Sequence, residues 1–206
     1  MRLPALVLGL ALSLAACGAA AQTDLPPGVF AGGKSLADAT AGTYAVDPAH
    51  AAVLVRVSHI GYSWSVFRFD EVAGKLVWDQ ATPTRSTLSV AVKTKSITSN
   101  VAGFAAELTG EQFLKSATYP EATFVSTSFR QTDATRGKVE GQFTLMGRTK
   151  PLTFDVELAG AGKGFFGKPR LGVQARGSFN PQDYGMLPLL GETMEIVVDV
   201  EFEREP

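Results

Sequence analysis

The chain has 206 residues and balances 19 basic against 20 acidic side chains, which gives a formal net charge of −1 at pH 7. Such a balance lacks the basic excess that nucleic-acid-binding proteins need, so we expect no nucleic-acid partner. A single cysteine excludes an internal disulfide, and only two histidines leave few ligands for a metal centre.

The first element is an apolar segment that ends at Cys17 and is preceded by Arg2 as its only charge. It is too short to span a bilayer but has the length of a signal-peptide core. The residues LAAC, 14–17, resemble the lipobox of bacterial lipoproteins, in which the cysteine is acylated and becomes the first residue of the mature protein. We therefore expect residues 1–17 to be a lipoprotein-type signal peptide, with lipidation at Cys17. The alternative is secretion with cleavage after the alanines 19–21, which would remove Cys17.

The cellular location follows from which of these two cleavages occurs. Several acyl chains on Cys17 would anchor a periplasmic protein stably to a membrane, and Gly18 after the cysteine resembles an outer-membrane sorting signal. Cleavage after residue 21 would instead release a soluble periplasmic protein. Residues 18–41 are rich in Ala, Gly and Pro and lack periodicity, which predicts a flexible linker. Residues 42–206 then form one domain.

Apolar residues of this domain alternate with a period of two from Tyr44 onward, which indicates antiparallel strands with one buried face. Turn-like breaks separate the strands, among them DQATPTR (79–85), TDATRGK (132–138) and NPQDYG (180–185). About eight strands can be counted, which is the number that closes into a barrel able to hold one small ligand. A two-sheet sandwich would give nearly the same pattern, so periodicity alone leaves both all-β folds open.

We expect the inward-facing side chains of these rows to bind a ligand if the barrel is hollow. The predicted ligand-binding residues are Val53, Val55, Val57, His59, Phe67, Phe69, Leu88, Val90, Val92, Phe104, Leu108, Phe113, Phe124, Phe143, Leu145, Phe154, Val156, Met194, Ile196 and Val198. A third possibility is an interaction or structural lipoprotein, whose interior is simply filled by its own side chains.

One segment departs from the alternation. Residues 99–114 predict a short helix with Ser99 or Asn100 as N-cap and Gly110 as its stop. Phe104 and Leu108 stand at helical spacing, and with residues 113 and 114 they would face the interior. The helix would either cover an opening of the barrel or serve as a plain crossover.

Both histidines lie in the stretch DPAHAAVLVRVSHIGYS, residues 47–63. A zinc site from Asp47, His50 and His59 is conceivable, but no HExxH or G-x-S-x-G motif occurs, so we predict neither a metal site nor a hydrolase. His59 is in phase with the valine row, as either a core residue bonded to a backbone carbonyl or a hydrogen-bonding point for the polar end of a ligand. His50 is predicted at the surface or in a hairpin. An enzyme that uses His59 and a nearby carboxylate on a lipid-like substrate is the alternative function.

Five short motifs then follow one another at compatible distances: YAVDPAHAAVLVRVSHIGYS, SITSN, YPEATFVSTSF, GQFTLMGRTKPLTFDV and FNPQDYGM. In these motifs the chain resembles the YceI-like family of periplasmic polyisoprenoid-binding proteins, from about residue 43 to 203. The resemblance implies an extended, eight-stranded, lipocalin-like barrel around an apolar tunnel that binds isoprenoid lipids such as quinones, with no catalysis and no cofactor. The matching positions are Asp47, Pro48, His50, His59, Gly61, Ser63, Tyr119, Pro120, Gly147, Thr149, Lys150, Pro151, Asp183 and Gly185.

Two departures from the family pattern concern the tunnel mouth. Phe104–Leu108 replaces a charged Arg-Asp-x-His-Leu stretch, and the segment SWSVFRF (63–69) lacks the usual glycine. A more apolar mouth implies a different opening or a different ligand head group. Edge strands and the apolar loop GMLPLL (185–190) could in addition pair two chains in a symmetric homodimer.

Overall fold

The computed structural model describes residues 25–206. The predicted signal peptide, Cys17 with its lipidation, and residues 18–24 of the predicted linker lie outside the described residues. Within residues 25–206, no helix has both the length and the apolar character needed to cross a membrane.

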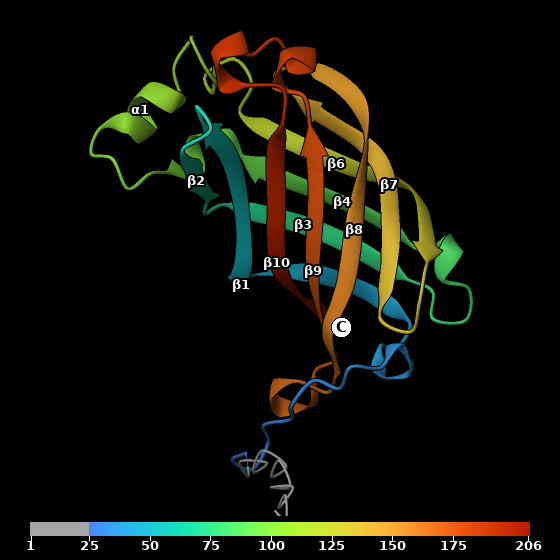
Figure 1. Ribbon diagram of the computed structural model, residues 1–206. Coiled ribbons are helices and arrows are strands. Elements are labelled where there is room, and N and C mark those ends of the chain that lie inside the picture. Colours follow the sequence, from blue (N-terminus) through green and yellow to red (C-terminus); the bar gives the residue numbers. More distant parts are fainter. Residues whose placement is uncertain (1–24) are drawn as a thin grey trace, which may run out of the picture.

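Ten antiparallel strands form one sheet, in the order β10-β9-β8-β7-β6-β4-β3-β1-β2-β5, and pairing of β10 with β1 closes it into a barrel (Figure 1). The strands are β1 (Gly42–His59), β2 (Ser63–Phe69), β3 (Val72–Trp78), β4 (Thr87–Lys93), β5 (Ile97–Thr98), β6 (Glu121–Gln131), β7 (Arg136–Leu145), β8 (Arg148–Gly162), β9 (Arg170–Phe179) and β10 (Met194–Arg204).

These ten strands occupy eight positions around the barrel, because two of the positions hold interrupted strands. β2 pairs with residues 53–59 of β1, whereas β3 pairs with residues 42–45 of the same edge. β4 and β5 continue one another in the same way, pairing with β3 and β2 respectively. The predicted eight-stranded all-β barrel is confirmed, and the two-sheet sandwich is excluded.

Alternation of side chains along each strand places the core inside the barrel. In β10, Met194 and Ile196 are buried inside, whereas Asp199 is exposed on the outer face. In β1, a bulge between Val46 and Ala51 interrupts the pairing with β10 and turns the intervening residues outward. The alternating apolar residues of the sequence therefore form the inner wall of the barrel.

The helical segment is shorter than predicted. The α-helix α1 spans Phe104–Leu108, and Gly103 precedes it in a left-handed conformation without a side-chain cap. The predicted N-caps are therefore wrong, and the hydroxyl of Ser99 instead accepts a bond from the backbone N–H of Val101 within a turn. After α1 the chain continues as turns closed by backbone bonds, such as that from the N–H of residue 115 to the carbonyl of residue 110. The described part of the chain also contains six short 3-10 helices: η1 (Leu36–Asp38), η2 (Pro83–Arg85), η3 (Thr94–Ser96), η4 (Phe165–Gly167), η5 (Pro181–Tyr184) and η6 (Pro188–Leu190).

The prediction of a flexible linker through residue 41 is wrong for its last part, which packs on the barrel. Gly33 forms an isolated bridge with Ala161 of β8. Ala39 is only 1% exposed, and its carbonyl accepts a hydrogen bond of 2.9 Å from the indole N–H of Trp78. A buried indole needs such a partner, which is why this segment closes over the barrel end.

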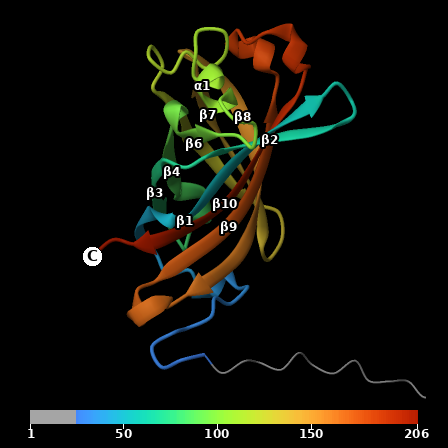
Figure 2. The same ribbon diagram turned by 90° about the vertical axis from the view of Figure 1, so that its left-hand side faces the viewer.

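Two ends of the barrel can be distinguished in Figure 2. The upper end carries the β1–β2 hairpin turn, α1 and the β9–β10 connection with η5 and η6. The lower end carries the N-terminal segment with η1 and the β8–β9 connection with η4. The described N-terminal segment and the β1–β2 hairpin therefore lie at opposite ends, because β1 runs from one to the other.

A candidate binding cavity

An apolar cavity of about 710 Å³ lies inside the barrel. Lining residues run from Val46 of β1 to Ile60 of the β1–β2 turn, which corresponds to roughly 45 Å of extended chain. Small-molecule sites usually have a volume of about 300–1,000 Å³, so the cavity can hold a ligand. The interior is therefore not filled by its own side chains, and its length suits an extended chain.

All twenty residues predicted as ligand-binding line this cavity, and so does Leu114 of the predicted helical segment. That they contact a ligand stays a prediction. Other residues that were not predicted also line the cavity. Val173 and Ala175 of β9 alternate with outward residues, so the same period of two could have found them. Leu36 and Val101 lie in irregular segments, where no periodicity marks the inward side.

His59 lies at the upper end of the cavity and is exposed. Its backbone carbonyl accepts from the N–H of Tyr62, but within residues 25–206 its imidazole forms no hydrogen bond with the protein. The prediction of a core residue satisfied by a backbone carbonyl is therefore wrong, and the role of a ligand partner stays open. Within residues 25–206 the histidine that forms an ion pair with a carboxylate is His50, with Asp47, and not His59.

Aromatic side chains build the wall near the upper end. The ring of Phe104 in α1 lies 6.0 Å from Phe67 of β2 and 6.4 Å from Phe113, which packs the helical segment against the barrel. Phe143, Phe179 and Tyr184 form a second group with centroid distances of 5.3–5.4 Å. Burial raises the pKa of Tyr184 to about 12, so its hydroxyl stays neutral at ordinary pH. Both groups line or border the cavity with uncharged surface.

Basic residues border the cavity at the β6–β7 hairpin. Arg136 lies 3.3 Å from a carboxylate oxygen of Glu157, and Lys138 pairs with Asp155. These acids stand opposite the two cations across the β7–β8 ladder. Arg136 and Lys138 are thus paired with acids of β8, while Arg130 of β6 also lines the cavity at this hairpin.

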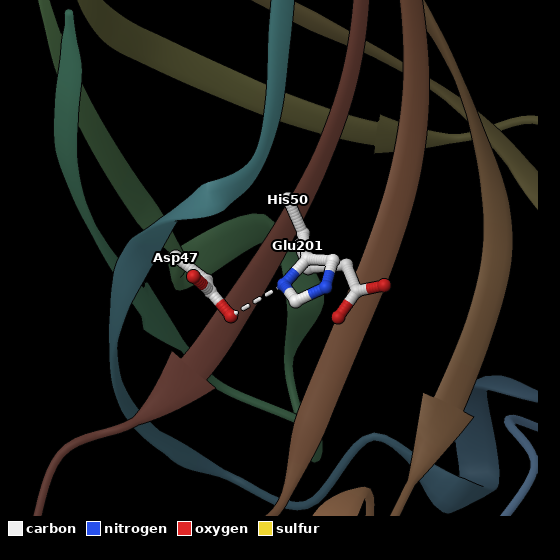
Figure 3. A group of neighbouring side chains, drawn as sticks. All are labelled: Asp47, His50 and Glu201. Atoms are coloured by element: carbon white, nitrogen blue, oxygen red, sulfur yellow. Dashed lines mark hydrogen bonds and ion pairs between the residues drawn. The ribbon is translucent and has the colours of Figure 1, made fainter.

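A charged cluster lies apart from the cavity, on the outer face at the β1 bulge (Figure 3). Ligand atoms of Asp47, His50 and Glu201 lie within 4.8 Å of one another. The guanidinium of Arg170 donates to Asp47 at 2.6 Å and to Glu201 at 2.7 Å, and it also binds Glu203. This cation neutralises the carboxylates that a metal would need, and the cluster fastens the bulge to β9 and β10.

The conceivable zinc trio of the sequence analysis does not assemble. Nδ1 of His50 lies in hydrogen-bond contact with Oδ2 of Asp47, at 2.9 Å. His59 lies nine residues further along β1, which places it roughly 30 Å from His50. His50 is exposed, as predicted, and it lies at the bulge rather than in a hairpin.

Asp47→Asn is expected to lower stability in a pH-dependent way. Partial burial raises the pKa of Asp47, but hydrogen bonds from His50 and Arg170 outweigh it and lower the pKa to about 2. Because the folded-state value lies below the unfolded value of 3.8, ionised Asp47 stabilises the fold above about pH 4, and this contribution is lost as the pH falls toward 2. We expect the free energy of unfolding to fall by about 2 kcal/mol at pH 7.

Denaturant unfolding at several pH values between neutral and strongly acidic checks this prediction. Asp199→Asn, on the outer face of β10, is the matched control and should change little. An equal loss for Asp47→Asn at neutral and acidic pH would show that the charge network does not stabilise the fold.

Several positions of the recognised family pattern specify turns. Gly61 follows Ile60 in the β1–β2 turn, where both have positive φ values of 80° and 53°, as a type I′ hairpin requires. Gly147 has the same place in the β7–β8 turn, and a Cβ there would lie 2.8 Å from the ring of Tyr119. The two glycines set the turns that position the wall, and neither is among the residues that line the cavity.

A family model described as the YceI-like domain matches residues 44–202. The chain belongs to the YceI-like family. Similar members include a UPF0312 protein of Pseudomonas putida (strain W619), 36% identical over 171 residues that cover 81% of this chain and 89% of that protein. Protein YceI of Escherichia coli O157:H7 is 33% identical over 172 residues, which cover 81% of this chain and 90% of that protein.

Solved structures share the barrel of this YceI-like chain. BcnA of Burkholderia cenocepacia has a TM-score of 0.68 at 17% identity, covering 76% of this chain and 98% of that one. A polyisoprenoid-binding domain from Saccharophagus degradans has a TM-score of 0.57 at 13% identity, covering 81% of this chain and 100% of that one. The recognised family and its lipocalin-like fold are thus confirmed.

Proposed function

We propose that this YceI-like protein binds the tail of a long isoprenoid lipid, of the quinone or polyprenyl type, inside its barrel and performs no bond chemistry on it. The observation that carries the proposal is the elongated apolar cavity, lined from Val46 to Ile60 along β1 and from Met194 to Phe202 along β10. A chain of apolar units fills such a space better than a compact polar molecule. The description of the Saccharophagus degradans domain as polyisoprenoid-binding supports the same ligand class.

The tail is expected to supply most of the affinity. Each methylene removed from water contributes about 0.8 kcal/mol, whereas a single hydrogen bond nets about 1 kcal/mol. Most of the cavity lining is apolar, and Ser58, His59 and Ser65 are polar residues that lie together near the upper end, on the paired strands β1 and β2. The head group then lies near these residues and sets the orientation of the ligand.

We further propose that this binding takes place in the bacterial periplasm. The lipobox-like residues 14–17 support attachment of the chain to the outer membrane through a lipidated Cys17. A protein that stores or carries an apolar lipid there would shield the tail from the aqueous compartment. Mass analysis of the mature chain tests the anchor, because acylation adds the mass of its acyl groups to a chain that begins at residue 17.

His59→Ala is expected to weaken binding of an isoprenoid quinone only about fivefold, because one hydrogen bond is lost while the tail contacts remain. Titration followed by quenching of Trp78, which lines the cavity, measures the affinity. His50→Ala removes the other histidine from the outer face and should leave the affinity unchanged. Complete loss of binding in His59→Ala would show that the head group, and not the tail, dominates recognition.

A further inference from the structure

We propose that the upper end of the barrel docks on the surface of a lipid bilayer, so that the cavity opens directly onto the membrane. Three segments surround the cavity opening at this end: the β1–β2 hairpin (57–66), the stretch that leads into α1 (99–106) and the β9–β10 connection (184–191). We call these three segments the mouth ring. The inference rests on the proposed function in one respect, which is that the cargo is a lipid.

The mouth ring carries no formal charge. Its sequences VSHIGYSWSV, SNVAGFAA and YGMLPLLG contain no Asp, Glu, Lys or Arg. By contrast, the β8–β9 connection at the lower end, KGFFGKP (163–169), has two cations, and Arg170 begins β9 directly after it. Placing a charged side chain in the apolar part of a membrane is costly, so only the upper end can approach the acyl chains without that penalty.

Apolar side chains of the mouth ring are exposed to solvent. Ile60 is 81% exposed and Tyr62 is 88% exposed at the tip of the hairpin. Trp64 on the same hairpin and Val101 beside α1 are also exposed. Trp and Tyr are the side chains that favour the interface between lipid and water.

An isoleucine is unusual in the backbone conformation at the tip of the β1–β2 hairpin. Ile60 has φ of 53°, in a left-handed region where a β-branched residue is strained and where Asn or Gly is the usual choice. The strained side chain gains nothing from packing, since it is exposed. An apolar surface that covers the tip supplies the reason for it.

The exposed surface of the mouth ring is continuous with the cavity wall. Ile60 of the hairpin, Val101 and Phe104 beside α1, and Met186 and Leu190 of the β9–β10 connection all line the cavity. A lipid tail that moves between the cavity and a bilayer would thus remain against apolar side chains throughout. A second protein copy seated on the same ring would close the opening, which disfavours a homodimer as the occupant.

Charges next to the mouth ring predict which membranes it binds. The acids that flank the ring are Glu107, Asp183 and Glu192. The flanking cations are Lys115, Arg148 and Arg56, whose guanidinium lies 4.7 Å from the ring centroid of Trp64, so both signs are present. Docking should therefore depend on apolar contact, with similar affinity for neutral and anionic vesicles and little sensitivity to salt.

Flotation with phosphatidylcholine vesicles tests the proposal, using the full chain with Cys17→Ala so that no acyl anchor contributes. Ile60→Asp and Phe166→Asp in this background are the matched pair. Both residues are exposed, at 81% and 89%, both have φ of 53°, and they lie at opposite ends of the barrel. Asp is tolerated in this backbone conformation, so neither variant should lose stability. We expect Ile60→Asp to lower the vesicle partition coefficient about tenfold, since the apolar contact at the tip is lost, and Phe166→Asp to leave it unchanged.

Fluorescence gives a second readout, because Trp64 lies on the mouth ring and Trp78 is buried in the barrel. Vesicles that contain brominated lipid should quench the wild type, and Trp64→Phe should abolish that quenching. The proposal would be overturned if the wild type did not bind vesicles, or if the two Asp variants partitioned equally. A dimer in solution that Ile60→Asp dissociates would also overturn it, since a second copy would then cover the ring. Native mass spectrometry of each variant distinguishes a failure of membrane docking from a failure of the proposed lipid binding. A protein that carries a lipid but does not bind vesicles refutes only the docking.

Discussion

Replacing Ala175 with phenylalanine is expected to weaken binding of a long isoprenoid chain about a hundredfold without destabilising the barrel. Ala175 lies in the middle of β9, between Val156 of β8 and Val198 of β10, and all three line the cavity. A ring at this position enters the space of about four methylenes, which removes roughly 3 kcal/mol of ligand contact, or a factor of about a hundred. The free energy of unfolding should stay level or rise, because the ring fills an apolar void.

Quinone titration and thermal unfolding of Ala175→Phe test this expectation together. Ala73→Phe is the control, since Ala73 is exposed on the outer face of β3 and the same ring would there point into solvent. Unchanged affinity in a stable Ala175→Phe protein would mean that the ligand does not occupy the middle of the barrel.

Ile196→Asn is expected to abolish measurable binding and to lower the free energy of unfolding by about 3 kcal/mol. Ile196 is 6% exposed, faces the cavity from β10 and pairs with Val55 across the β1 ladder. An amide there has no hydrogen-bonding partner, in the presence or absence of an apolar tail. Both the barrel wall and the ligand contact therefore lose stability.

Val197→Asn is the control for this substitution, because Val197 is the next residue of the same strand and faces outward, paired with Arg176 of β9. It should bind the quinone like the wild type and lose less than about 1 kcal/mol of stability. Titration is carried out well below the unfolding midpoint of each variant. If Val197→Asn lost affinity as severely as Ile196→Asn, the loss would come from damage to the strand and not from the cavity wall.

The inner wall could be predicted from the sequence because strand geometry alternates side chains strictly between two faces. In β10, the apolar Met194 and Ile196 alternate with Glu195 and Asp199, and the structure places the first pair inside. The interruption between β2 and β3 breaks this alternation, since Phe69 and Val72 both face inward although only the two residues Asp70 and Glu71 lie between them. Eight positions could therefore be counted although the structure has ten strands.

Features that depend on contacts between distant segments could not be predicted. Arg170 lies 123 residues from Asp47, and no local pattern indicates that they meet at the β1 bulge. Ala39 was predicted to belong to a flexible linker. Its carbonyl accepts a hydrogen bond from Trp78, and only the folded barrel brings these two residues together. The segment around α1 carries helical spacing, but Gly103 and the turns after Leu108 restrict the helix to five residues.

Native mass spectrometry of the full chain with Cys17→Ala, expressed in bacterial cells and purified without detergent, tests the central claim most directly. We expect a complex that exceeds the mass of the chain, with a non-covalent apolar molecule that organic extraction releases and that Ala175→Phe protein lacks. A spectrum that contains only the bare chain, from cells shown to contain isoprenoid lipids, would contradict a lipid-filled barrel.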